Sequence, residues 1–135
     1  MTITFIKSHH ETGGLFDAYE VTIPPSPHLA VPHLLHLHRQ CDETVIGIDG
    51  YTLWSVDGVS TRLGPGDQLF IPRGASHRLI NEESRSARIL CVLTPGVLGP
   101  EYFGELAFAM DAEGPTNYAA LGIIMARYGV IPGTL

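Results

Sequence analysis

Two histidines and a carboxylate lie close together in the stretch LHLHRQCDE, residues 35–43. Residues two apart in a β-strand point to the same face, so His36 and His38 could hold a single ion between them. Glu43 follows a short polar break where the chain can turn, and a reversal there would bring it back to the same ion. Taken alone, the pattern is weak evidence for a metal site, and two surface or core histidines explain it better.

A third histidine follows in the stretch GDQLFIPRGASHRLIN, residues 66–81. Pro72 and Gly74 predict a tight turn after a short strand, and His77 opens the next strand. Such a turn can aim one imidazole at a point that another sheet also reaches. Together with His36, His38 and Glu43, this residue would complete a site of three nitrogens and one oxygen. That set suits Fe(II), Mn(II), Co(II), Ni(II) or Zn(II) without choosing among them.

The spacing of these residues resembles the two sequence motifs of the cupin superfamily. The first motif, H-x-H, four residues, E, six residues, G, is met by His36, His38, Glu43 and Gly50. The second, G, five residues, P-x-G, two residues, H, three residues, N, is met by Gly66, Pro72, Gly74, His77 and Asn81. Ala30 departs from the family, which often places glycine six residues before H-x-H.

The resemblance implies an all-β fold, the cupin double-stranded β-helix or jelly-roll barrel. It implies that His36, His38, Glu43 and His77 hold one divalent transition metal ion, and that the chain pairs as a homodimer. Segments 94–107 and 126–130 look like those of small single-domain bacterial cupins of the quercetin dioxygenase-like type. Fold-level likeness of this kind says little about the substrate.

The strand pattern agrees with a β-sandwich or barrel. Short runs rich in β-branched and aromatic residues are separated by glycine and proline. The pairs Asp49–Gly50 and Asp57–Gly58 are hairpin signals, because a type I′ turn needs positive φ at both central positions. Nine strands are predicted, near residues 2–7, 15–23, 28–38, 44–48, 51–56, 59–63, 68–71, 77–81 and 88–94.

The last third of the chain predicts helices. One begins at Pro100, which suits a first helical position. A second begins with Thr116 as N-cap and stops at Gly129. We therefore expect a barrel over residues 1–98 and a helical extension over residues 99–135. The apolar stripes of the extension would pack on the barrel mouth, as a lid, or on a partner subunit.

Composition limits the classes of partner. The 135 residues suit one domain, and a net charge of −6 without a basic stripe argues against nucleic acid. No apolar run approaches the roughly 20 residues that span a bilayer, and no secretory signal is visible. The two cysteines, Cys41 and Cys91, do not form a disulfide framework, which favours a reduced, cytoplasmic setting.

The favoured function is a metal-dependent dioxygenase acting on a small aromatic or enol-type substrate. Glu43 would serve as metal ligand and as catalytic base, with a pKa raised by burial. A non-redox isomerase, lyase or polyketide cyclase would use the ion as a Lewis acid. A small-molecule-binding barrel without catalysis is the third class.

Two other residues, Gly47 and Arg78, allow two interpretations each. Gly47 is in phase with Glu43 and marks either close approach by a ligand or a bulge. Arg78 is solvated, or holds an anionic substrate at the barrel mouth. The remaining expectations are core positions for Tyr19, Trp54 and Phe70, a plain loop cysteine at Cys41, an amide that satisfies turn backbone at Asn81, and solvated or surface histidines at His9, His10, His28 and His33.

Overall fold

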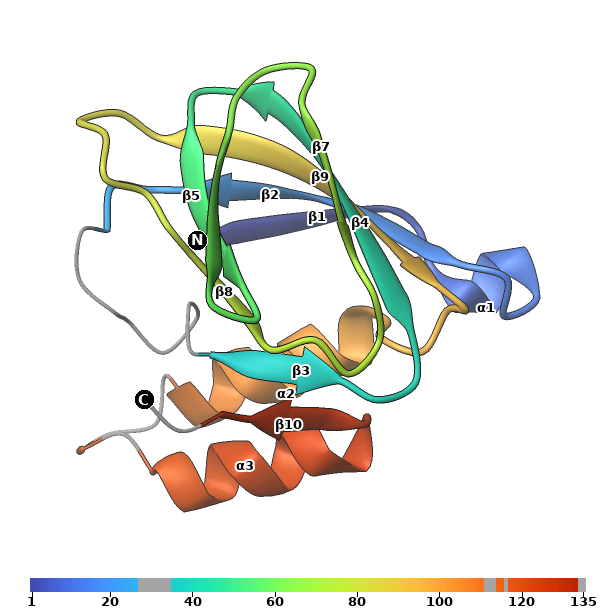
Figure 1. Cartoon of the computed structure of the whole chain (residues 1–135). Coiled ribbons are helices and arrows are strands. Elements are labelled where there is room, and N and C mark those ends of the chain that lie inside the picture. The colour runs from blue at the N-terminus through green and yellow to red at the C-terminus, as the bar shows by residue number, and fades with distance from the viewer. Residues whose placement is uncertain (27–34, 111–113, 116, 134–135) are drawn as a thin grey trace.

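The computed structural model describes residues 1–26, 35–110, 114–115 and 117–133. Two five-stranded antiparallel sheets face each other and form a double-stranded β-helix (Figure 1). One sheet has the order β1 (Thr2–Lys7), β2 (Asp17–Ile23), β9 (Ala87–Thr94), β4 (Asp42–Asp49) and β7 (Gln68–Ile71). The other has the order β10 (Val130–Pro132), β3 (His36–His38), β8 (His77–Ile80), β5 (Thr52–Val56) and β6 (Val59–Leu63). The predicted jelly-roll barrel is confirmed.

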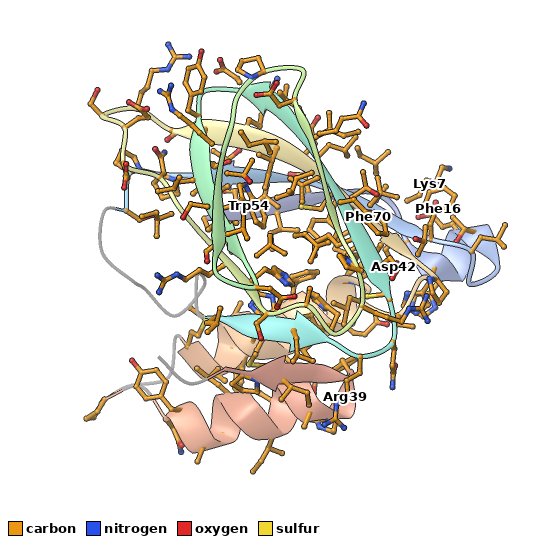
Figure 2. All side chains as sticks on the ribbon, in the orientation of Figure 1. Lys7, Phe16, Arg39, Asp42, Trp54 and Phe70 are labelled. Atoms are coloured by element: carbon orange, nitrogen blue, oxygen red, sulfur yellow. The ribbon has the colours of Figure 1, made fainter. Side chains whose placement is uncertain are left out.

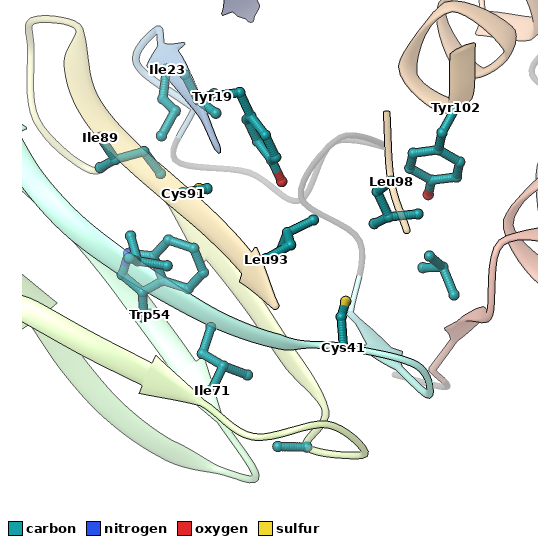
Figure 3. Packing of buried hydrophobic residues seen from close by; sticks show 14 of the residues in the cluster. Tyr19, Ile23, Cys41, Trp54, Ile71, Ile89, Cys91, Leu93, Leu98 and Tyr102 are labelled. Carbon is teal, nitrogen blue, oxygen red and sulfur yellow. The ribbon is translucent and has the colours of Figure 1, made fainter. Parts of the chain in front are cut away.

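The core fills the space between the sheets. Along β4 and β9 buried residues alternate with more exposed ones, as expected of strands with one face inward. Trp54, Val45 and Leu93 are among the most buried side chains and belong to one core cluster. Trp54 points into the barrel interior (Figure 2), and Leu93 lies near it there (Figure 3). Tyr19 is also buried, as expected, whereas the core prediction for Phe70 is wrong, because this side chain on edge strand β7 is 60% exposed.

The two predicted hairpin turns have different outcomes. Asp57 and Gly58 have φ of 48° and 81°, and they join the paired strands β5 and β6 as a type I′ turn requires. Asp49–Gly50 is not a hairpin. Only Gly50 has a positive φ, 70°, and the pair carries the chain from β4 in one sheet to β5 in the other.

Gly47 is required by the backbone of a neighbouring segment. A Cβ at this position would lie 2.0 Å from the carbonyl oxygen of Gly64. Its N–H donates to Asp67 O at 2.9 Å, and its carbonyl accepts from Gly66 N–H at 2.9 Å. The strand register also shifts between Gly47 and Asp49. The predicted bulge is therefore confirmed. The group that approaches Gly47 closely is the main chain of Gly64, and not a ligand as the alternative predicted.

Both C-terminal helices are present, as α2 (Pro100–Met110) and α3 (Tyr118–Arg127). Asn117 caps α3 by accepting a hydrogen bond from Ala120 N–H at 3.0 Å, and Gly129 follows the helix with φ of 74°. The predicted N-cap, Thr116, lies outside the described residues. Among the described residues, no helix is long and apolar enough to cross a bilayer.

Two elements were not predicted. The short helix α1 (His9–Thr12) begins with a capping box between Ser8 and Glu11. Strand β10 pairs with β3 at the edge of its sheet, a place that tolerates Pro132. The predicted strand 28–38 is confirmed only at His36–His38, since residues 27–34 are not described. The domain division at residue 98 stays a prediction.

We predict that Gly47→Ala lowers the free energy of unfolding by about 1–3 kcal/mol, because the added methyl group would overlap the Gly64 carbonyl. Gly104→Ala is the matched control. Gly104 lies inside α2 with nothing within 4 Å of an added Cβ. There the same substitution should stabilise the fold by about 0.5–1 kcal/mol. Urea unfolding measures both, and equal effects at the two positions would contradict the close approach.

Candidate metal centre

Three imidazoles meet on the inner face of the β3–β8 pair. His36 on β3 lies directly opposite His77 on β8 in the antiparallel register, with ring centroids 4.4 Å apart. His38, two residues along β3, has its ring centroid 5.0 Å from that of His36 and 5.1 Å from that of His77. One ring nitrogen of each histidine lies within 4.8 Å of the other two. The juxtaposition predicted from the spacing is confirmed.

Glu43 reaches the same place from the opposite sheet. It lies near the start of β4, immediately after the turn that the polar break predicted. Its Oε1 atom lies 3.3 Å from His38 Nε2 and 3.9 Å from His77 Nε2. Glu43 is 5% exposed as a whole residue, so its carboxylate belongs to the barrel interior. The structure thus brings all four predicted side chains together.

The turn before β8 orients His77. Gly74, with φ of 87°, donates its N–H to His38 O at 2.7 Å, which ties the turn to β3. His77 Nδ1 lies 3.0 Å from Ala75 O. A carbonyl can only accept, so Nδ1 carries the proton and Nε2 keeps its lone pair toward the centre. A backbone partner of this kind is the usual support of a metal-binding histidine, and the sequence offered no signal for Ala75.

Among the described residues, His38 is a buried histidine whose ring nitrogens lack hydrogen-bond partners. Both of its ring nitrogens are buried without a hydrogen-bond partner, because the 3.3 Å contact with Glu43 lacks hydrogen-bond geometry. Burying an unpaired polar nitrogen costs roughly 1–3 kcal/mol. A cation between the imidazoles and Glu43 would give Nε2 a ligand bond. The residues present therefore fit a metal ion.

The charges at the centre also favour a cation. Burial raises the pKa of Glu43, but its contact with His38 and the positive charge that the surrounding imidazoles carry when protonated outweigh burial and bring its pKa to about 2. The expectation of a raised pKa for a catalytic base at this residue is wrong. Burial lowers the pKa of His77, so that ring is neutral at pH 7. A bound cation would replace the positive charge that a neutral His77 does not supply.

The centre opens onto a cavity of about 680 Å³. This volume suits a small molecule. His36, His38 and Glu43 form part of its wall, and Arg78 is another charged side chain there. Apolar side chains of the C-terminal helices line another part of the wall, through Tyr102, Phe103, Leu106, Leu121 and Met125. The helices therefore pack against the barrel of their own chain.

The other residues singled out in the sequence take varied places. Tyr19 and Trp54 belong to the core and also line the cavity, which their sequence pattern did not indicate. Cys41 is buried, and burial raises the pKa of its thiol to about 12, which argues against a redox role. The Asn81 amide donates to Ile23 O and Arg85 O, as expected of a turn residue. His28 and His33 lie outside the described residues.

Comparison with known proteins places this arrangement in a family. Residues 19–93, more than half of the chain, match the family model described as Cupin domain. A search of curated protein sequences finds no match.

Solved structures share the fold at low sequence identity. KdgF from a Halomonas species is 19% identical with a TM-score of 0.59, over 69% of this chain and 76% of that one. A sugar phosphate isomerase from Silicibacter pomeroyi DSS-3 is 23% identical with a TM-score of 0.56, over 70% and 60%. The DMSP lyase DddQ from Ruegeria pomeroyi DSS-3 is 26% identical with a TM-score of 0.52, over 60% and 39%. The chain thus spans well under half of that lyase.

We predict that the metal-free protein loses stability as the pH falls below about 6.5. His77 has a folded-state pKa below its ordinary value of 6.5, so the unfolded chain takes up the proton first and unfolding is favoured. Each unit of difference corresponds to about 1.4 kcal/mol. Glu43 acts in the same direction only at lower pH, as the pH falls from 4.5 toward 2.

Urea unfolding between pH 7.5 and pH 5 measures this dependence. The control is His77→Gln, which removes the titrating ring and should flatten the curve in that window. Identical pH dependence in the two proteins would show that His77 is not responsible.

Proposed function

Because the chain belongs to the cupin family, we propose that it is a metal-dependent enzyme in which His36, His38, Glu43 and His77 hold one divalent transition metal ion. The observation that carries the proposal is the convergence of three imidazoles and an ionised carboxylate at one point, where His36, His38 and Glu43 also line an apolar cavity. The donor set suits Fe(II), Mn(II), Co(II), Ni(II) or Zn(II). Such an ion, when bound, supplies Lewis acidity toward a substrate oxygen and, if it is redox-active, reactivity with O₂.

The cavity supports a substrate with an apolar or aromatic body. Tyr19, Trp54 and Tyr102 give it flat apolar surfaces, and His36, His38 and Glu43 give it polar groups at the metal centre. A phenol or enol hydroxyl placed there could donate a hydrogen bond to the ionised Glu43, which orients the substrate. We therefore propose a dioxygenase acting on a small aromatic or enol-type substrate, with α2 and α3 excluding water from the centre.

A non-redox reaction is the second candidate. The solved structures with similar folds include proteins described as a sugar phosphate isomerase and a DMSP lyase. Arg78 on the cavity wall could bind an anionic group of such a substrate. The mainly apolar wall favours the aromatic or enol-type substrate, because a sugar would need more hydrogen-bonding side chains than the described wall offers.

The homodimer stays a prediction. Strand β1 lies at the edge of its sheet, where its outer backbone groups could pair with another chain. Ile6 on this strand is 51% exposed.

We predict that His77→Ala loses the barrel metal while the fold is retained. The imidazole is one of four proposed ligands, and the turn at Pro72–Gly74 is held without it by the hydrogen bond from Gly74 N–H to His38 O on β3. Elemental analysis of iron-loaded, desalted protein measures metal content. Ser76→Ala is the matched control, since it alters the preceding residue of the same turn and should keep the metal. Full metal content in His77→Ala would count against the proposed ligands.

The reaction class is tested by oxygen uptake on a panel of small phenols, enols and 1,3-diketones. Metal-stripped protein is loaded separately with Fe(II), Mn(II), Co(II), Ni(II) and Zn(II). A dioxygenase consumes O₂ with one of the redox-active ions and is inactive with zinc. Product formation without O₂ consumption would contradict the dioxygenase and favour an isomerase or lyase. Tight ligand binding without turnover under every ion would indicate a binding protein.

A further inference from the structure

A second cluster of metal-binding side chains lies outside the barrel, where α1 meets the start of α2. His9 and His10 come from α1, and Glu101 comes from the first turn of α2. One donor atom of each lies within 4.8 Å of the other two. The sequence predicted solvated histidines here. The His10 side chain is 62% exposed, as predicted, whereas the His9 side chain is only 21% exposed, and both rings lie beside the carboxylate of Glu101.

The spacing of the donor atoms suits a tetrahedral ion. Glu101 Oε1 lies 2.9 Å from His10 Nε2 and 3.6 Å from His9 Nε2. Ligands about 2.0–2.1 Å from a tetrahedral zinc ion stand roughly 3.3 Å from each other. The two separations from Glu101 bracket that value, and the remaining donor pair, His9 and His10, lies within 4.8 Å.

Asp17 prepares His9 for metal binding. It is fully buried, and its Oδ1 accepts from His9 N–H at 2.5 Å and lies 3.0 Å from His9 Nδ1. Its Oδ2 accepts from Leu98 N–H at 3.0 Å. With the Nδ1 proton donated to this carboxylate, the His9 Nε2 lone pair points to Glu101. A carboxylate that orients a histidine in this way is the common outer support of zinc ligands.

Two glycines leave room for the cluster. A Cβ at Gly96 would lie 2.4 Å from His9 Cβ. A Cβ at Gly99 would lie 2.8 Å from His9 Cε1 and 2.9 Å from Glu101 Oε1. A larger residue at either position would displace His9 or Glu101. The 95–99 connection is thus shaped to let α1 and α2 meet through these side chains.

We propose that His9, His10 and Glu101 form a second metal site, which binds a zinc-class divalent ion with water in the remaining position. Two imidazoles and one carboxylate are the ligands such ions take. The site is independent of the barrel centre and shares no residue with it.

The ion would act as a clip, that is, a link that fastens the first turn of α2 to the barrel beside the cavity. Glu101 precedes Tyr102, which is buried on the cavity wall, and α2 continues along that wall through Phe103 and Leu106. His9 is anchored to Asp17 on β2. An ion joining His9, His10 and Glu101 would therefore fasten the first turn of α2 to the barrel.

Zinc titration of metal-stripped protein at pH 7.5, against a chromophoric chelator, tests the site. One of the zinc ions bound by the wild-type protein should still bind in the His77→Ala variant. Glu101→Gln and His10→Ala should each weaken that ion at least tenfold. Glu83→Gln, which removes a partly exposed carboxylate on the β8–β9 connection, is the control and should change nothing. Unchanged zinc stoichiometry and affinity in both Glu101→Gln and His10→Ala would overturn the site.

The same variants separate this site from the barrel centre. Loss of a zinc ion in His77→Ala alone reports on the barrel, and loss in Glu101→Gln alone reports on the clip. Amide hydrogen exchange tests the clip itself. In His77→Ala, zinc should slow exchange across α2 at least severalfold, and the added Glu101→Gln change should abolish that slowing. Exchange rates across α2 that zinc does not change in the His77→Ala variant would contradict the proposal that the ion fastens α2 to the barrel.

Discussion

An ionised carboxylate buried between two sheets is the interaction on which the rest of the site depends. Glu43 projects from β4, and the two imidazoles within 4 Å of its carboxylate, His38 and His77, belong to the other sheet. A buried charge is tolerated only with partners close by. The sheets must therefore be held in one register here. A slip of one residue along β4 would turn Glu43 outward and bring Thr44 in its place.

The strand that carries two of the histidines is too short to hold them unaided. β3 has three residues, and it lies between β8 on one side and β10 on the other. Val130 and Pro132 of β10 pair with His38 and His36. The last described strand of the chain thus supports a motif almost a hundred residues earlier. The helices that lead to β10 also form the cavity wall, so the C-terminal segment shapes both the metal centre and its access.

In both histidine clusters one histidine is oriented by an oxygen atom close to its Nδ1, but the surroundings of the two clusters differ. His77 is turned by the carbonyl of Ala75, and His9 is turned by the carboxylate of Asp17. In each case Nδ1 is occupied and Nε2 is left for an ion. The barrel cluster is buried beside an apolar cavity, where substrate could meet the ion. The outer cluster is partly exposed and joins two helices, which suits a structural ion.

The sequence determined the local features and the spacing of the site. Alternating strand residues put His36 and His38 on one face, Asp57–Gly58 made the type I′ turn, and Gly129 ended α3, because each depends on near neighbours. Asp49–Gly50 looked the same locally, but the pairing of β4 with β7 and β9 made it a crossing between sheets.

Tertiary contacts decided the features that join residues distant in the chain. These are the Gly64 carbonyl against Gly47, the pairing of β10 with β3, and the meeting of α1 with Glu101. The pKa of Glu43 belongs here too, since burial alone would raise it and only the imidazoles from the facing sheet bring it down. No local pattern records which distant groups will face a side chain, because that depends on how the whole barrel closes.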